Sequence, residues 1–172
     1  KGKDGQVHTG TVRVLPDYLA IGSNDDFVRI PMGGPTGQRI AEAFGCSLPT
    51  RKLVEEVWKA ADVRLQPIPL PPTAQMMSNE WTATHHRKIE QERAGHALGE
   101  LTAGTKKDVV LTNRYESSPG HVAIYGWHQL NGKPIQGLNL SHESSYADYS
   151  HGIRLVAGNM IVDGVERPVA DV

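Results

Sequence analysis

The pair Asn131-Gly132 lies between two apolar runs, residues 121–128 and 134–140, and limits most strongly what this chain can fold into. Asn-Gly between two apolar runs is the strongest short-range signal for a β-hairpin, because a type I′ turn needs positive φ angles at both central residues. The sequence therefore predicts two antiparallel strands that meet at this pair. A further strand is predicted over residues 107–112, just before the hairpin.

Short strands are also predicted at both ends of the chain. Turn-forming residues separate three runs near the N-terminus, 11–15, 18–22 and 27–31, and we expect these to form a small antiparallel unit. Near the C-terminus, Asp163-Gly164 predicts the turn of a last hairpin within residues 159–172. Residues 1–6 are polar and Gly-rich, and we expect them to be loose.

Two amphipathic helices are predicted after the N-terminal strands. The first begins at Pro35 or Thr36 and ends at Phe44, with Gly45 just after its last turn. The second begins near Thr50. Its apolar residues recur at spacings of three and four, as in a helix with one buried face: Leu53, Val54, Val57, Trp58 and Ala61.

The middle of the chain is less regular. Residues 63–73 contain four prolines, so they cannot form a helix, and we expect an extended crossing over the surface. Residues 81–101 predict a polar helix that ends near Gly99 or Gly104. The simplest expectation for His85 and His86 on this helix is exposure to solvent.

Composition limits the class of protein. A chain of 172 residues with 38% hydrophobic residues suits one domain with a real core. The net charge of −1 argues against a nucleic-acid binder, which needs a basic face. No apolar run approaches the roughly 20 residues that span a bilayer. The chain begins with Lys1 rather than Met, so we expect a processed chain from which a signal peptide could have been removed.

Three pieces of the chain carry a resemblance to a known family. Residues 44–47 (Phe-Gly-Cys-Ser) and the helix after them are similar to an Asp-Cys-Ser motif followed by a helix. Residues 107–111 are similar to a Gly-Asp-Leu-Val-Phe strand, and residues 121–125 to a His-Val-Gly-Ile-Tyr strand. In this order they resemble the NlpC-type family of papain-like cysteine endopeptidases of bacterial cell walls. Gly45 stands where that family usually has Asp, and residues 48–52 look like an insertion before the helix.

The resemblance implies an α+β fold with a papain-like core, in which N-terminal helices pack on an antiparallel sheet. The whole chain, 1–172, would be one domain, with N-terminal strands over 1–33 and the hydrolase core over 34–172. It also implies an extracytoplasmic thiol-dependent amide hydrolase that cleaves peptidoglycan stem peptides. Its partner would be a peptide or cell-wall polymer, and no cofactor is expected.

Four residues are the predicted catalytic groups. By the resemblance, Cys46 is the nucleophile, His121 the general acid and base, and Gln136 the group that orients His121. His142, in the polar and aromatic segment that follows, could replace Gln136 in this role. A nearby imidazolium or a helix N-terminus stabilises a thiolate, and the imidazole then protonates the leaving amine. A plainer interpretation stays open, in which Cys46 is a small buried apolar residue, His121 caps a strand and Gln136 is a surface amide.

Five further residues are predicted to bind substrate: Tyr125, Trp127, Tyr149, His151 and Arg154. Tyr149 and His151 belong to a segment dense in polar and aromatic groups, which is unusual for a plain loop. They could line a substrate cleft, act as an acid–base pair, or hydrogen-bond their own backbone. Arg154 could pair with a substrate carboxylate, although a surface salt bridge is the commoner role.

Two other classes of function compete with the thiol hydrolase. The first is a metal- or Tyr/His-dependent enzyme that degrades another polymer and uses His121, His142, Tyr149 and His151. Zinc ligands could come from His85, His86 and His96, or from His128, His142 and His151, but the sequence has no HExxH motif, and we predict no metal site. The second class is a non-enzymatic cell-wall-binding module with a buried, unreactive Cys46.

Overall fold

The computed structural model describes residues 5–171, and its described part is an α+β protein. Its α-helices are α1 (Gly34–Ala43), α2 (Arg51–Ala60) and α3 (Asn79–Glu92). Two short 3-10 helices, η1 (Asn113–Glu116) and η2 (Val169–Asp171), complete the helical elements of this part. The predicted loose segment lies partly outside it, because residues 1–4 are not described.

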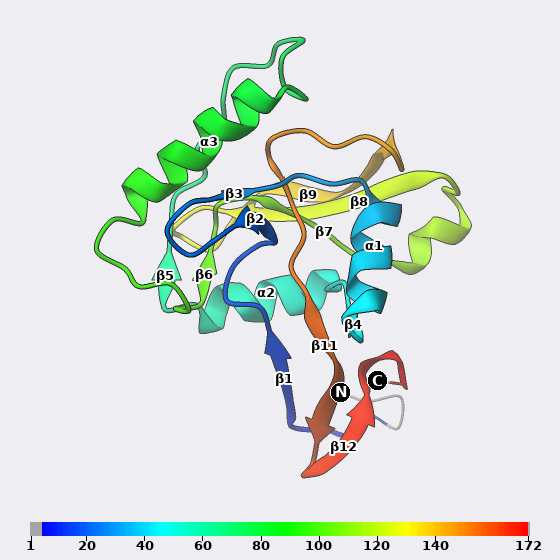
Figure 1. The fold of residues 1–172 in the computed structure, drawn as a ribbon. Coiled ribbons are helices and arrows are strands. Elements are labelled where there is room, and N and C mark those ends of the chain that lie inside the picture. Colours follow the sequence, from blue (N-terminus) through cyan, green and yellow to red (C-terminus); the bar gives the residue numbers. More distant parts are fainter. Residues whose placement is uncertain (1–4, 172) are drawn as a thin grey trace.

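The predicted hairpin forms the larger part of a four-stranded sheet with the order β10-β7-β8-β9. These strands are β7 (Lys107–Val109), β8 (His121–His128), β9 (Pro134–Glu143) and β10 (His151–Gly152). In Figure 1, α2 lies below the strands of this sheet, and α3 lies above them on the left. Strands β8 and β9 are antiparallel, which confirms the prediction from the Asn-Gly pair.

The turn of this hairpin differs from the predicted type I′ turn. Gly132 has φ 81°, but Asn131 is not among the residues with positive φ. The chain instead makes a longer loop, in which Gln129 N donates to Lys133 O at 2.9 Å. Asn131 accepts a hydrogen bond from Lys133 N through its side-chain oxygen, and this holds the loop without a positive φ at Asn131.

A second sheet joins the two ends of the chain. Strand β11 (Val156–Val162) pairs antiparallel with β1 (Gly10–Val14), β12 (Val165–Pro168) and the short β4 (Cys46–Ser47). The β11–β12 turn has φ 50° at Asp163 and 83° at Gly164, which confirms the C-terminal hairpin. The predicted N-terminal unit is wrong in part: β2 (Ala20–Gly22) pairs with β3 (Phe27–Arg29), but β1 pairs with β11.

The first two helices form as predicted. Pro35 lies in the first turn of α1, and Gly45 follows its end with φ 62°, a conformation that suits glycine. Thr50 caps α2, because its side chain accepts a hydrogen bond from Leu53 N.

Two expectations for the middle of the chain need correction. Residues 63–73 form no helix and are mostly exposed or half-buried, as predicted, but β5 (Val63–Arg64) pairs with β6 (Thr102–Ala103) and the apolar side chains Leu65 and Leu70 are buried. His85 and His86 on α3 are not solvated, since their exposed fractions are 0% and 9%. The polar side of α3 faces inward because buried charged groups, such as Arg29, lie opposite it and pair with it.

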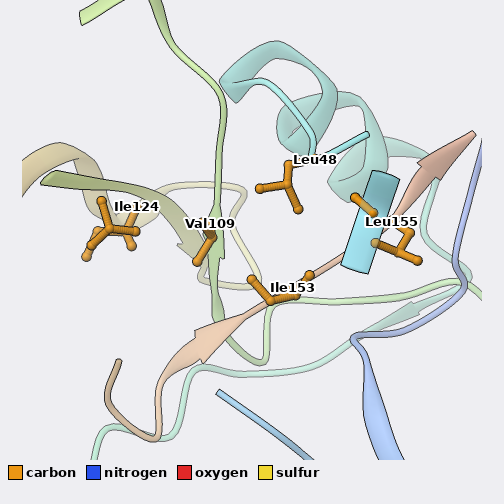
Figure 2. Packing of buried hydrophobic residues seen from close by; sticks show 7 residues of the cluster. Leu48, Val109, Ile124, Ile153 and Leu155 are labelled. Carbon is orange, nitrogen blue, oxygen red and sulfur yellow. The ribbon is translucent and has the colours of Figure 1, made fainter. Parts of the chain in front are cut away.

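The main hydrophobic cluster lies between α1, β4 and one face of the β7–β8 pair. Figure 2 shows its labelled members, which come from distant parts of the chain: Leu48, Val109, Ile124, Ile153 and Leu155. A smaller cluster on the opposite face of β8 includes Val54 of α2 with Ala123 and Tyr125. No helix within residues 5–171 is long and apolar enough to cross a membrane.

Candidate functional site

A cavity of about 480 Å³ lies between the N-terminal end of α1 and the first residues of β8. Its lining is mainly apolar and includes Leu48, Leu111 and the ring of Tyr115. His121, Gln38 and Ser144 supply polar groups to it. Apolar walls with a few fixed polar groups are typical of sites for small ligands and for substrate side chains.

The start of α1 is packed tightly against the chain around this cavity. A Cβ atom on Gly33 would lie 2.5 Å from the carbonyl oxygen of Ser144, so only glycine fits there. Gly33 is the N-cap residue and provides no side-chain cap. Pro35 has no N–H group, and the first N–H groups of a helix have no partner inside it. The amide of Gly34, which lines the cavity, is therefore available to an oxygen at this end of the helix.

His121 is held in one tautomer by a backbone carbonyl. Its Nδ1 lies 3.0 Å from Pro119 O, and because a carbonyl oxygen only accepts hydrogen bonds, Nδ1 carries the proton. In the neutral ring, Nε2 then has a free lone pair. The half-buried His121 lines the cavity, so the site contains an oriented imidazole that can take up a proton.

Neither predicted partner of His121 orients it. In the β8–β9 register Gln136 lies opposite Gly126, five residues along β8 from His121, which is about 17 Å at the rise of an extended strand. His142 lies opposite Val122, so its side chain projects from the other face of the sheet. The predicted orienting role is therefore wrong for both residues, and the Pro119 carbonyl takes it.

Cys46 lies outside the cavity. It pairs with Ala157 on β11, packs beside the main hydrophobic cluster, and donates a hydrogen bond from Sγ to Phe44 O at 3.5 Å. A thiolate is favoured at the N-terminus of a helix, whereas Cys46 follows the C-terminal end of α1. Cys46 is not among the residues that line the His121 cavity, although Leu48, two residues further on, lines it.

The five predicted substrate-binding residues are buried, with exposed fractions from 0% to 4%. Trp127 packs with Tyr149, and the Tyr149 hydroxyl exchanges hydrogen bonds with the backbone of Leu70. The Arg154 guanidinium donates to the carbonyl oxygens of Leu15 and Thr102. These five side chains therefore lie inside the fold rather than in an open cleft. Tyr125 is a partial exception, because it reaches a different cavity.

The Tyr/His-rich segment does form a cluster, but with other members than predicted. The rings of His142 and Tyr146 stack with centroids 4.1 Å apart, and His151 lies 5.7 Å from Tyr146 and 6.4 Å from His142. The Tyr146 hydroxyl donates to Asp148 at 3.2 Å. Burial lowers the pKa of His151 to about 4, so this ring is neutral at pH 7. His121 and Tyr149 are not part of this cluster.

Each predicted set of zinc ligands has members that lie elsewhere in the fold, although His142 and His151 lie close together. His85 packs against Trp127 and Tyr149, His96 pairs with Glu100 at 3.0 Å, and His128 stacks on Trp58. Across residues 5–171, no group of three His, Cys, Asp or Glu side chains is placed to hold a metal ion.

Comparisons with protein-family models, with curated proteins and with solved structures found no match for this chain. The chemistry of the site is therefore argued from its own geometry. Sequence patterns missed the Pro119 carbonyl and Ser144. The run Gly33-Gly34-Pro35 was the available signal for the cavity, because it marks an uncapped helix start that the backbone can approach closely.

Proposed function

We propose that this chain is a hydrolase that cleaves amide bonds in peptides, with His121 as its catalytic base. One observation carries the proposal: the Pro119 carbonyl fixes the proton of His121 on Nδ1 and leaves Nε2 free beside the cavity. A base held in one tautomer by its second ring nitrogen is what proton transfer in catalysis requires.

The reaction would proceed in two proton transfers. Nε2 of His121 takes a proton from a water molecule, whose oxygen attacks the carbonyl carbon of the substrate. The amide of Gly34, at the start of α1, is the donor that would stabilise the oxyanion formed in this step. The imidazolium then gives its proton to the leaving nitrogen as the carbon–nitrogen bond breaks. Water replaces the thiol as nucleophile because Cys46 does not line the cavity.

The papain-like core and the cell-wall substrate belong to the same proposal. The first is supported by the packing of α1 at the start of β8, where a Cβ on Gly34 would lie 3.4 Å from the Val122 side chain. The second rests on the resemblance to the NlpC-type family and makes peptidoglycan stem peptides the first substrates to assay. An extracytoplasmic location would follow from such a substrate.

The test is the release of amino groups from purified stem peptides by the intact chain. Replacing His121 by Ala should lower kcat/KM by about 10²–10⁴-fold, the usual contribution of a general base. His96→Ala is the matched control, since His96 is exposed and lies away from the cavity. Full activity of His121→Ala would contradict the proposal. So would an inactive wild-type chain, which would favour a binding module.

Replacing Cys46 by Ala distinguishes attack by water from attack by the Cys46 thiol. We expect this variant to keep wild-type turnover, because the Cys46 thiol is bound to Phe44 O and faces the hydrophobic cluster. Loss of turnover in a folded Cys46→Ala variant would restore the thiol mechanism and refute attack by water.

A further inference from the structure

A second cavity, of about 330 Å³, lies between α2 and the far end of β8. It shares no lining residue with the His121 cavity. The charged residues of its lining come from one side of α2, with Arg51 and Glu55 one turn apart, while Tyr125 and His128 come from β8. Its volume is at the lower end of the range for small-molecule sites.

The polar groups of this cavity are held in place by one another. Glu55 Oε1 accepts a hydrogen bond from the Tyr125 hydroxyl at 2.8 Å and another from Arg51 Nε at 3.0 Å. The Arg51 guanidinium lies 5.1 Å from the centre of the Tyr125 ring. Within the described chain, no hydrogen bond reaches Glu55 Oε2, and most N–H groups at the end of Arg51 stay available.

The ionisation of the lining follows from these contacts. The hydrogen bond from Tyr125 keeps the pKa of Glu55 below its ordinary value, so Glu55 is a carboxylate. Burial lowers the pKa of His128, so its ring is neutral at pH 7 and offers one donor and one acceptor. The cavity therefore presents a guanidinium, a carboxylate and a neutral imidazole together, with the ammonium group of Lys59 as a second cation in its lining.

The backbone of β8 is strained at this place. Trp127 has φ 55°, which is unusual for a bulky residue, and Gly126 before it has φ 105°. The irregularity turns Trp127 toward Leu70 and Tyr149, on the other side of the sheet. It brings His128 onto the side of Tyr125, where the two ring centroids are 5.8 Å apart. Strain of this kind occurs often at functional sites, and here it creates the wall of the cavity.

The chemistry of the lining selects among anions. The guanidinium fork matches a carboxylate, and the neighbouring Glu55 Oε2 can accept from an ammonium or amide N–H. Inorganic phosphate has no N–H group to offer to Glu55 Oε2, and Lys59, the second cation of the lining, is paired with Glu56 at 2.8 Å. We propose that this cavity binds the end of an amino acid or peptide, through a carboxylate on Arg51 and the adjacent N–H group on Glu55.

The test is a binding titration of the full chain, monitored by NMR chemical shifts or calorimetry. Five probes are used: L-alanine, L-alanyl-L-alanine, N-acetyl-L-alanine, L-alaninamide and inorganic phosphate. L-Alanine and the dipeptide should bind saturably. Arg51→Gln should weaken the affinity for both ligands by at least about tenfold, because it removes a charge-assisted hydrogen bond to their carboxylate. Lys52→Gln is the control, since Lys52 is exposed and outside the lining.

A second variant tests the Glu55 contact. Glu55→Gln should weaken the binding of L-alanine more than the binding of N-acetyl-L-alanine, because only L-alanine carries an ammonium group. His121→Ala should leave all binding unchanged, so this proposal can fail or stand independently of the hydrolase proposal.

Three results would overturn the inference. One is the absence of saturable binding by L-alanine and the dipeptide. Another is equal binding of L-alanine to Arg51→Gln and to wild type when both melt at the same temperature. The third is a preference for L-alaninamide or phosphate over L-alanine, which would show that the cavity recognises something other than a carboxylate with an adjacent N–H group.

Discussion

Arg154 is a buried guanidinium that ties distant segments together. It is 1% exposed and donates to Leu15 O and to Thr102 O, both at 2.7 Å. Its guanidinium carbon lies 4.5 Å from the centre of the Tyr18 ring, and its Nε lies 3.9 Å from Asp108. The positive charge thus compensates a carboxylate that is itself buried, and two carbonyl groups depend on it.

Replacing Arg154 by Leu should lower the free energy of unfolding by about 3–5 kcal/mol, the usual cost of removing one partner from a buried charged network. Burial already raises the pKa of Asp108 to about 6, and without Arg154 this carboxyl would lose the charge that opposes the rise. Urea unfolding at pH 7 measures the change. Arg39→Leu, at an exposed position on α1, should stay within about 0.5 kcal/mol. Equal stability of the two variants would refute this role for Arg154.

Single residues were predictable from the sequence only where a local rule applied. Thr50 was identified as the start of a helix because a cap is a local signal, and the structure confirms it. The orienting partner of His121 is a backbone carbonyl, which no side-chain pattern reveals. Counting outward from the Asn-Gly turn could have excluded Gln136, because it lies close to the turn and His121 lies far from it.

Strand β8 is the element that separates the two cavities. His121 at its start belongs to the first, and Tyr125 and His128 near its end belong to the second. The irregular backbone at Gly126 decides this arrangement, since a regular strand would place Tyr125 and His128 on opposite faces. The alternation of side chains along a strand is predictable from sequence, but a bulge of this kind is not.

Replacing Gly126 by Ala should destabilise the protein by about 1–2 kcal/mol, because an L-residue at positive φ is strained. The new Cβ would also lie 3.2 Å from Val54 and 3.4 Å from the His128 ring, so His128 should shift and L-alanine binding should weaken. The control is Gly137→Ala on β9, where nothing lies within 4 Å of the new atom and φ is not positive. Thermal unfolding and titration should distinguish the two variants, and equal behaviour would contradict the strain argument.

The buried face was predicted correctly for α2 and incorrectly for α3, and one physical reason explains both results. The apolar stripe of α2 packs on the sheet, so its periodicity told which face is buried. On α3, His85, His86 and Glu90 are turned toward a polar interior, and a rule that places polar residues outside gives the wrong face. Sequence periodicity cannot show which charged groups will meet inside the fold.

The whole molecule is organised around two interiors of different chemistry. One is the apolar cluster between α1 and the sheet. The other lies under α3 and contains Arg29, His85 and Lys106, each with an exposed fraction of 0–1%. Burial lowers the pKa of Lys106 to about 7, and its Nζ donates to Tyr149 O at 2.6 Å. A change in the protonation of these buried groups therefore changes the free energy of unfolding.

The last prediction concerns stability in mild acid. Burial lowers the pKa of His85 to about 3 and of His151 to about 4, against an ordinary value of 6.5 in the unfolded chain. The unfolded chain therefore binds more protons between about pH 4 and 6.5, and the free energy of unfolding should fall as the pH falls through this window. Asp108, whose pKa burial raises to about 6, acts in the opposite direction and offsets one of the two histidines.

In the His85→Leu variant the unfolded chain no longer binds a proton at this position. The slope of the free energy of unfolding against pH should therefore decrease by about 1.4 kcal/mol per pH unit between pH 6 and 4. Urea unfolding at several pH values measures this slope. His96→Leu is the control, because His96 is exposed and should leave the slope close to that of the wild type. If the His85→Leu slope equalled the wild-type slope, His85 would have to be protonated in the folded state. The polar interior under α3 would then be open to water rather than sealed from it.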